Sequence, residues 1–167
     1  MIVVSDTSPV LSLARIRRLD LLRVLYQQVL IPSSVYQELR AFSSQPPGQI
    51  DFDAVPWLIV ATPLDRRRVE ELLEDLDLGE AEAIVLAIER QADLLLIDER
   101  RGRRTAQASG LAITGLLGVV AQAKRARLID AARPVLDDLI RIARFWIGPT
   151  STLKCSLNLA KSDGSAV

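Results

Sequence analysis

Four acidic residues occupy positions at which α/β proteins commonly carry their ligand-binding and catalytic side chains. Asp6 and Asp98 come at the ends of short apolar runs, at residues 2–4 and 94–97, and these runs have the composition of buried strands. Glu80 stands at the start of a helix, inside its apolar sector, and Glu38 borders the apolar face of an earlier helix. Because parallel strands end at one edge of a sheet, where such proteins bind ligands, we expect these four carboxylates to converge there.

Such a group of carboxylates predicts a metal site. Like charges in one crevice raise one another's pKa unless a cation neutralises them. The chain has no histidine and one cysteine, so the available ligands are oxygen atoms, which suit Mg²⁺ or, as a substitute, Mn²⁺. An ion held in this way activates water and neutralises charge during in-line attack on a phosphodiester.

Each acid also has a purely structural interpretation, which the sequence leaves open. Asp6 and Asp98 are suitable caps for the helices that follow them. Glu38 is suited to a solvated helix face, and Glu80 to a helix N-terminus, where the dipole favours negative charge. Glu82 falls opposite the apolar sector of its helix, so we expect it to lie in solvent.

Length and composition limit the class of protein. The chain has 167 residues, 49% of them hydrophobic, which is enough for one domain with a core. No apolar run approaches the roughly 20 residues needed to span a bilayer, and we expect a cytoplasmic protein. The absence of histidine excludes catalytic triads that use it and most zinc enzymes. The 21 basic residues balance 21 acidic ones, so only local charge patches can indicate a nucleic-acid partner.

The expected elements alternate between strands and helices, which predicts an α/β fold with a parallel sheet covered on both faces. Strands are predicted at residues 2–4, 29–31, 57–60, 94–97 and 112–114. Ser34 to Gln37 fits a capping box, residues 41–56 read as an irregular loop, and residues 64–76 as a charged helix. We expect one domain at residues 1–147 and a mobile C-terminal tail at residues 148–167.

Five motifs, in this order along the chain, carry a family resemblance: VVSDTSPV, IPSSVYQEL, LDLGEAEAI, LLLIDERRGR and LAITGLLGVV. Together they resemble the PIN-domain nucleases, in particular the small prokaryotic branch related to VapC-type toxins. The resemblance implies a Rossmann-like, three-layer α/β/α fold with a metal-dependent ribonuclease site. It implies Asp6, Glu38, Glu80 and Asp98 as catalytic metal ligands, with Glu82 as the alternative third acid and Glu99 assisting through water. An antitoxin protein and a homodimer are also implied.

Hydroxyl and guanidinium groups near the acids are candidate substrate ligands. Thr7 and Ser8 are placed to orient a phosphate or a metal-bound water, although turn formation explains them equally well. Guanidinium groups match phosphate oxygens, so the arginines that follow Asp98 are candidates to hold an RNA backbone. Ordinary surface charge is the alternative. These arginines are Arg100, Arg101, Arg103 and Arg104.

The leading hypothesis is therefore a magnesium-dependent endoribonuclease, the toxin of a toxin–antitoxin pair. One rival is a receiver-like phosphoacceptor module, which expects adjacent acids after the first strand and a lysine after the last, whereas Ser5 precedes Asp6 and Gly115 follows the last strand. The other rival is a catalytically silent PIN fold that serves as a binding or dimerisation module. The sequence does not specify the RNA target.

Overall fold

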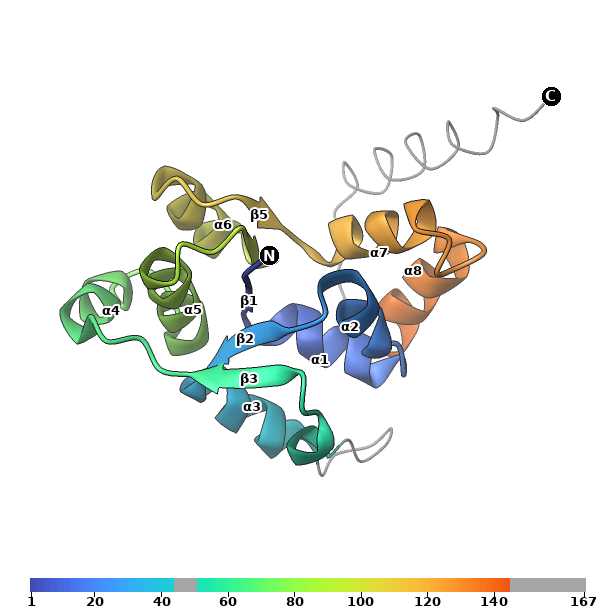
Figure 1. Ribbon diagram of the computed structural model, residues 1–167, viewed down its shortest axis with the longest axis horizontal. Helices are drawn as coiled ribbons and strands as arrows, with labels where there is room; N and C mark the ends of the chain where they lie inside the picture. The colour runs from blue at the N-terminus through green and yellow to red at the C-terminus, as the bar shows by residue number, and fades with distance from the viewer. Residues whose placement is uncertain (44–50, 145–167) are drawn as a thin grey trace.

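The computed structural model describes residues 1–43 and 51–144. Its centre is a five-stranded parallel sheet with the strand order β3-β2-β1-β4-β5 (Figure 1). The predicted α/β fold with a parallel sheet is thus confirmed. The strands are β1 (Val3–Ser5), β2 (Val29–Pro32), β3 (Leu58–Ala61), β4 (Leu94–Leu96) and β5 (Ile113–Thr114).

Eight α-helices and one short 3-10 helix connect these strands within the described residues. The α-helices are α1 (Thr7–Arg15), α2 (Asp20–Tyr26), α3 (Ser33–Ser43), α4 (Arg66–Leu72), α5 (Leu78–Glu89), α6 (Arg100–Ala108), α7 (Leu116–Arg125) and α8 (Ala132–Arg141). The 3-10 helix η1 covers Phe52–Ala54, inside the segment that the sequence suggested was an irregular loop. The tail expected at residues 148–167 lies outside the described residues.

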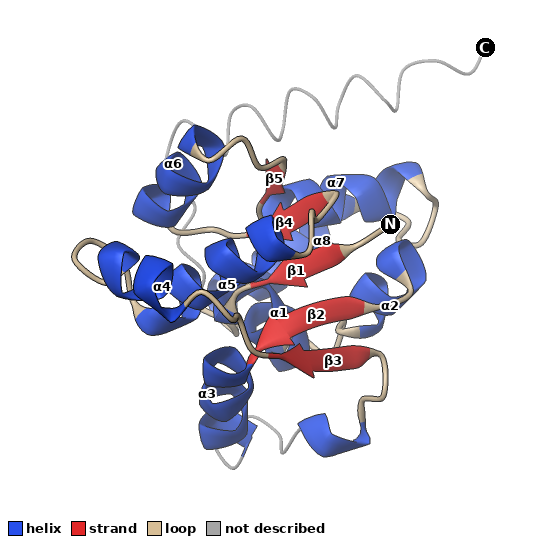
Figure 2. Ribbon diagram, turned by 60° about the vertical axis from the view of Figure 1, so that its left-hand side comes forward, coloured by secondary structure: helices blue, strands red, loops and turns tan. Residues whose placement is uncertain are grey.

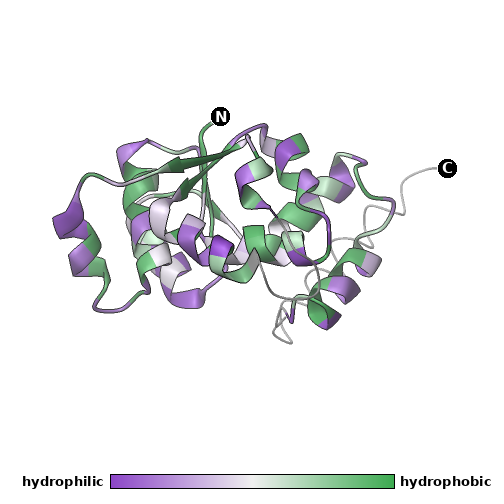
Figure 3. Cartoon of the chain, turned by 90° about the horizontal axis from the view of Figure 1, so that it is seen from below, coloured by the Kyte–Doolittle hydropathy of each residue, from purple (hydrophilic) through white to green (hydrophobic). Residues whose placement is uncertain are grey.

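Two hydrophobic clusters, one on each face of the sheet, give the fold its three layers. On one face Val3, Ile31 and Leu96 pack against α1, α2, α3, α7 and α8. On the other face Val4 and Leu95 pack against α4, α5 and α6 (Figure 2). In Figure 3 the central strands are hydrophobic, while the helices around them carry both hydrophobic and hydrophilic residues. None of the described helices is long and apolar enough to cross a membrane.

The sheet order places a topological switch point at β1. The chain moves outward from β1 through β2 to β3, and it then returns to the other side of β1 to form β4 and β5. In doubly wound sheets, ligands bind in the crevice at the carboxyl ends of the strands beside such a point. In a receiver domain the first strand lies between the second and the third, whereas here β1 lies between β2 and β4. The sheet order therefore argues against the receiver hypothesis.

Candidate functional site

Asp6 lies at the carboxyl end of β1 and is almost completely buried, with 3% of its surface exposed. Its backbone N–H donates to the Leu96 carbonyl at 3.1 Å, which fixes it beside the end of β4. It occupies the N-cap position of α1, yet its side chain forms no capping hydrogen bond within the described residues. Asp6 Oδ1 is buried without a hydrogen-bond partner in this part of the chain, although the Ser8 backbone N–H lies close enough to the carboxylate to oppose the rise of its pKa.

Asp98 follows β4 on the neighbouring side of the same crevice and is half-buried. Its two oxygens accept the Leu116 backbone N–H at 2.9 and 3.2 Å, so it caps α7 instead of the helix that follows it directly. A Cβ on Gly115 would lie 2.4 Å from Asp98 Oδ1, so this close approach requires glycine. Asp98 is therefore a helix cap, as its structural interpretation allowed. It caps α7, however, and not α6, the helix that follows it in the sequence.

Glu80 points inward from the first turn of α5, as its helical position predicted, and only 6% of it is exposed. Glu80 Oε1 has no hydrogen-bond partner among the described residues. A Cβ on Gly102 would lie 2.6 Å from this oxygen, so α6 approaches α5 closely over the carboxylate. Asp77, which the sequence interpretation missed, caps α5 by accepting the Glu80 backbone N–H at 2.8 Å. The spacing Asp77-x-x-Glu80 was the available signal.

Glu38 lies on α3 and is half-buried. Its Oε2 accepts a hydrogen bond from the Thr7 hydroxyl in the first turn of α1. Its Oε1 lies 3.3 Å from the position that a Cβ on Gly79 would take, and Asp77 Oδ1 lies 3.5 Å from the same position. Glu38 therefore reaches the N-terminal ends of both α1 and α5, where Asp6 and Glu80 lie.

The pKa values of Asp6, Glu80 and Asp98 are all raised, and that of Asp6 responds to the charges of the other two. Burial raises the pKa of Asp6 well above its usual value, and the charges of Asp98 and Glu80 raise it further. Burial, and then the charge of Asp77, raises the pKa of Glu80 to about 7. Burial also raises the pKa of Asp98 to about 6, although the Leu116 N–H opposes this shift. Negative charge therefore accumulates in this crevice without sufficient compensation by the protein. We call Asp6, Glu38, Glu80 and Asp98 the acidic site.

The acidic site suits a hard cation in its chemistry. Its donors are all carboxylate oxygens, two of them buried without partners in the described part of the chain. Within residues 1–43 and 51–144, no three acidic side chains come together as a ready-made cage for an ion. Mg²⁺ does not require such a cage, because it keeps several waters and is commonly held by one or two carboxylates. The residues present therefore fit a hydrated divalent ion.

Glu82 contradicts the expectation that it lies in solvent, because only 3% of it is exposed. Its Oε2 accepts the Ser34 hydroxyl at 2.7 Å and the Ser34 backbone N–H at 3.3 Å. Its Oε1 accepts Arg66 Nη1 at 2.6 Å. Burial alone would raise the pKa of Glu82, but the bonds from Ser34 and Arg66 together lower it. Both oxygens are thus engaged, which makes Glu80 the better candidate for the third acid.

Ser34 is also not the N-cap that the capping-box interpretation required. It lies inside the first turn of α3, which begins at Ser33, and its hydroxyl donates to Glu82. Glu82 therefore connects the start of α3 to α5, and through Arg66 to α4.

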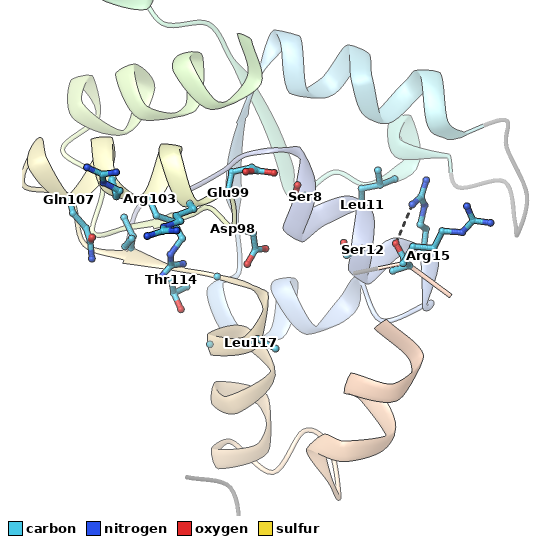
Figure 4. A pocket seen from close by; sticks show the side chains of 17 residues that line it. Ser8, Leu11, Ser12, Arg15, Asp98, Glu99, Arg103, Gln107, Thr114 and Leu117 are labelled. Atoms are coloured by element: carbon cyan, nitrogen blue, oxygen red, sulfur yellow. Dashed lines mark hydrogen bonds between the residues drawn. The ribbon is translucent and has the colours of Figure 1, made fainter. Parts of the chain in front are cut away.

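A cavity of about 920 Å³ opens beside Asp98 (Figure 4). Most of the candidate substrate ligands line this cavity, namely Ser8, Arg100, Arg103 and Arg104. Glu99 lines it as well. Arg103 is fixed there, because its Nη1 donates to the Ile97 carbonyl at 2.9 Å. Thr7 is not among the lining residues and is bonded to Glu38, and Arg101 is exposed outside the cavity. The sequence interpretation missed Arg15, which lines the opposite wall, because nothing local distinguishes it from other surface arginines.

The fold and the acidic site define a Rossmann-like α/β/α protein with candidate metal ligands at its switch point. The comparison with protein families agrees: residues 2–161 match the family model DUF3368, described as a PIN domain. The chain therefore belongs to the PIN-domain family, as its motifs suggested. The match continues beyond residue 147, where we expected the domain to end. A search of curated proteins finds no match. PIN domains are generally nucleases, which act on nucleic acid and typically use divalent metal ions.

Proposed function

We propose that this protein is a magnesium-dependent endoribonuclease that hydrolyses RNA phosphodiester bonds, with Mn²⁺ as a substitute ion. The observation that carries the proposal is the pair of buried oxygens, Asp6 Oδ1 and Glu80 Oε1, that have no partner in the described residues. Burial without compensation is costly for a carboxylate, so such groups indicate a ligand that neutralises them. The toxin role, a partner antitoxin and a homodimer rest on the resemblance to VapC-type toxins, and a cytoplasmic location is proposed from the lack of a long apolar run in the sequence.

In this proposal Asp6, Glu38, Glu80 and Asp98 hold the metal. When bound, the ion lowers the pKa of a coordinated water and stabilises charge on the phosphoryl oxygens. The Thr7 hydroxyl holds the Glu38 carboxylate, and the Leu116 N–H holds that of Asp98, so both side chains are oriented before a ligand arrives. Glu99 lines the cavity wall next to Asp98, and in this proposal it would assist the reaction through a water molecule.

The arginines of α6 complete the proposed site. Arg100, Arg103 and Arg104 line the cavity next to Asp98 and Glu99. Guanidinium groups pair with phosphate in a bidentate manner, so these residues are suited to hold the RNA backbone while the acids hold the metal. Ser8 contributes a hydroxyl to the same wall.

The first test is cleavage of a labelled single-stranded RNA with Mg²⁺, Mn²⁺ or EDTA. Asp6→Asn and Asp98→Asn remove one negative charge each at constant size, and an asparagine at position 98 still offers an oxygen to the Leu116 N–H. We expect cleavage with either metal, none with EDTA, and a loss of at least about 100-fold in each variant. Asp137→Asn, at an exposed position on α8, is the matched control and keeps full activity.

Two results would contradict the proposal. Cleavage that persists in EDTA, or in both variants after their folding has been verified, would exclude the acidic site as the metal centre. If the wild-type protein neither cuts RNA nor binds Mn²⁺ in calorimetry, the silent PIN-fold binding module becomes the better explanation.

A further inference from the structure

The cavity beside the acidic site has basic groups on two sides. Figure 4 shows Arg103 and Gln107 on one side of Asp98 and Arg15 on the other, with Glu99 and Ser8 between them. The first side belongs to α6, which also contributes Arg100 and Arg104. The second side combines the end of α1, at Arg15, with Arg144, which follows α8. Two separate parts of the fold therefore present guanidinium groups on either side of Asp98 and Glu99.

Arg15 is held in this position by its neighbours. Its Nη1 lies 3.4 Å from the Ala143 carbonyl, and its guanidinium lies 5.4 Å from the centre of the Phe42 ring. A guanidinium has five N–H donors, so one long hydrogen bond leaves donors for a ligand. Arg15 is half-buried on the wall, and Arg144 beside it is exposed. A partly immobilised guanidinium loses less freedom when it binds phosphate.

From this arrangement we infer that the cavity binds one continuous RNA single strand that passes Asp98 at the edge of the acidic site, with phosphates held by α6 on one side and by Arg15 and Arg144 on the other. The inference rests on the proposed function and assigns a substrate path to it. The cavity volume of about 920 Å³ lies near the top of the range of about 300–1,000 Å³ for ligand pockets, so it has room for a short strand segment. A strand held on both sides is cut internally.

The test first measures binding apart from cleavage. Labelled single-stranded RNA is titrated with the full-length protein in EDTA, where the proposed reaction does not proceed, and the titration is repeated at several salt concentrations. We expect Arg15→Gln to weaken binding by about tenfold. It should also reduce the slope of log affinity against log salt by about 0.7, the value for one phosphate contact of a single strand. Arg15→Lys keeps the charge and restores most of the salt slope.

Matched variants separate a phosphate contact from a folding defect. Arg144→Gln changes the same wall at an exposed position and should weaken binding in the same direction. Arg133→Gln removes an exposed arginine of α8 outside the cavity and should change neither affinity nor salt slope. If Arg15→Gln and Arg144→Gln behave like Arg133→Gln, or if the wild-type protein does not bind RNA at low salt, the inference is wrong.

The strand path has its own readout in cleavage with Mg²⁺. In the wild-type protein, phosphodiesters near either end of an RNA should be cut more slowly than internal ones. When the cut lies near an end, the RNA supplies phosphates to only one of the two arginine walls. Arg15→Gln should remove this penalty at one end only, and Arg104→Gln at the other end only. If both variants affect the same end, the path past Asp98 is wrong, while metal-dependent cleavage lost in Asp98→Asn would still support the proposed function.

Discussion

Asp6, Glu80 and Asp98 bring three raised pKa values into one crevice, and the sign of their effect on stability follows directly. The pKa of Glu80 rises from about 4.3 in an unfolded chain to about 7 in the folded protein. The pKa values of Asp98 and Asp6 are raised as well. Between the unfolded and folded values, the folded protein binds more protons than the unfolded chain. Its stability therefore falls as the pH rises through this window.

We accordingly expect the metal-free protein to melt at a lower temperature at about pH 8 than at about pH 5. Thermal unfolding in EDTA across this range is the measurement. Added Mg²⁺ should raise the melting temperature most at high pH, where the carboxylates are ionised. Asp6→Asn should flatten the pH dependence, because it removes one of the raised groups. Higher stability at pH 8 than at pH 5 in EDTA would contradict the assigned shifts.

At the scale of elements, Glu82 joins three helices through one buried carboxylate. It accepts two hydrogen bonds from Ser34 on α3 and one from Arg66 on α4. Arg66 is more than half exposed, so solvent weakens that ion pair, and the buried bonds to Ser34 dominate. The position of α3 matters for the proposed metal site because Glu38 lies one turn after Ser34.

Glu82→Ala should therefore lower the free energy of unfolding by about 1–3 kcal/mol, since it leaves the Ser34 donors buried without an acceptor. Glu82→Gln keeps one oxygen for Ser34 and should cost less. Urea denaturation measures both effects. Glu71→Ala, which breaks an exposed pair with Arg67, is the control and should cost about 0.3–0.5 kcal/mol at most. A cost for Glu82→Ala no larger than that of the control would contradict this assignment.

The burial of Glu82 also shows where sequence reasoning fails. The prediction assumed that a helix has one buried face and one exposed face. Helix α5 instead lies between the sheet, α3, α4 and α6, and every residue from Gly79 to Ala87 is buried. A helix covered on several sides has no solvent face for its polar residues. The prediction that Glu80 points inward was correct because its place on the apolar side of the helix faces the protein interior whether or not the other sides of the helix are covered as well.

Across the whole molecule, the parallel sheet was predictable because its strands are short apolar runs separated by helical periodicity. The pairings that depend on distant packing were not. Asp98 caps α7 across the sheet edge, and Arg15 meets the end of α8. Neither contact has a local signal in the sequence. The acidic positions and the arginines of α6 could be predicted from the sequence, but the cavity wall that contains Arg15 and Arg144 could not.

The layered architecture predicts a gradient of local stability. β1 and β4 pair with each other and are enclosed by strands on their outer sides, whereas β3 is an edge strand with Ile59 and Val60 exposed. Hydrogen exchange should therefore be slowest for amides of β1 and β4 and faster in β3 and in the short helix α4. Mass spectrometry of exchanged peptides measures this order. Faster exchange in β1 than in β3 would contradict it.

The central pairing also has a consequence for synthesis. β1 is the first strand to be made, yet its register is completed by β4, with Val3 beside Leu94 and Ser5 beside Leu96. Asp98 then obtains its hydrogen bonds only when Leu116 is in place. A nascent chain that has not yet released these later segments from the ribosome therefore lacks the complete acidic site. The proposed site therefore forms only after the start of α7 has left the ribosome, although its first ligand, Asp6, is among the first residues to be made.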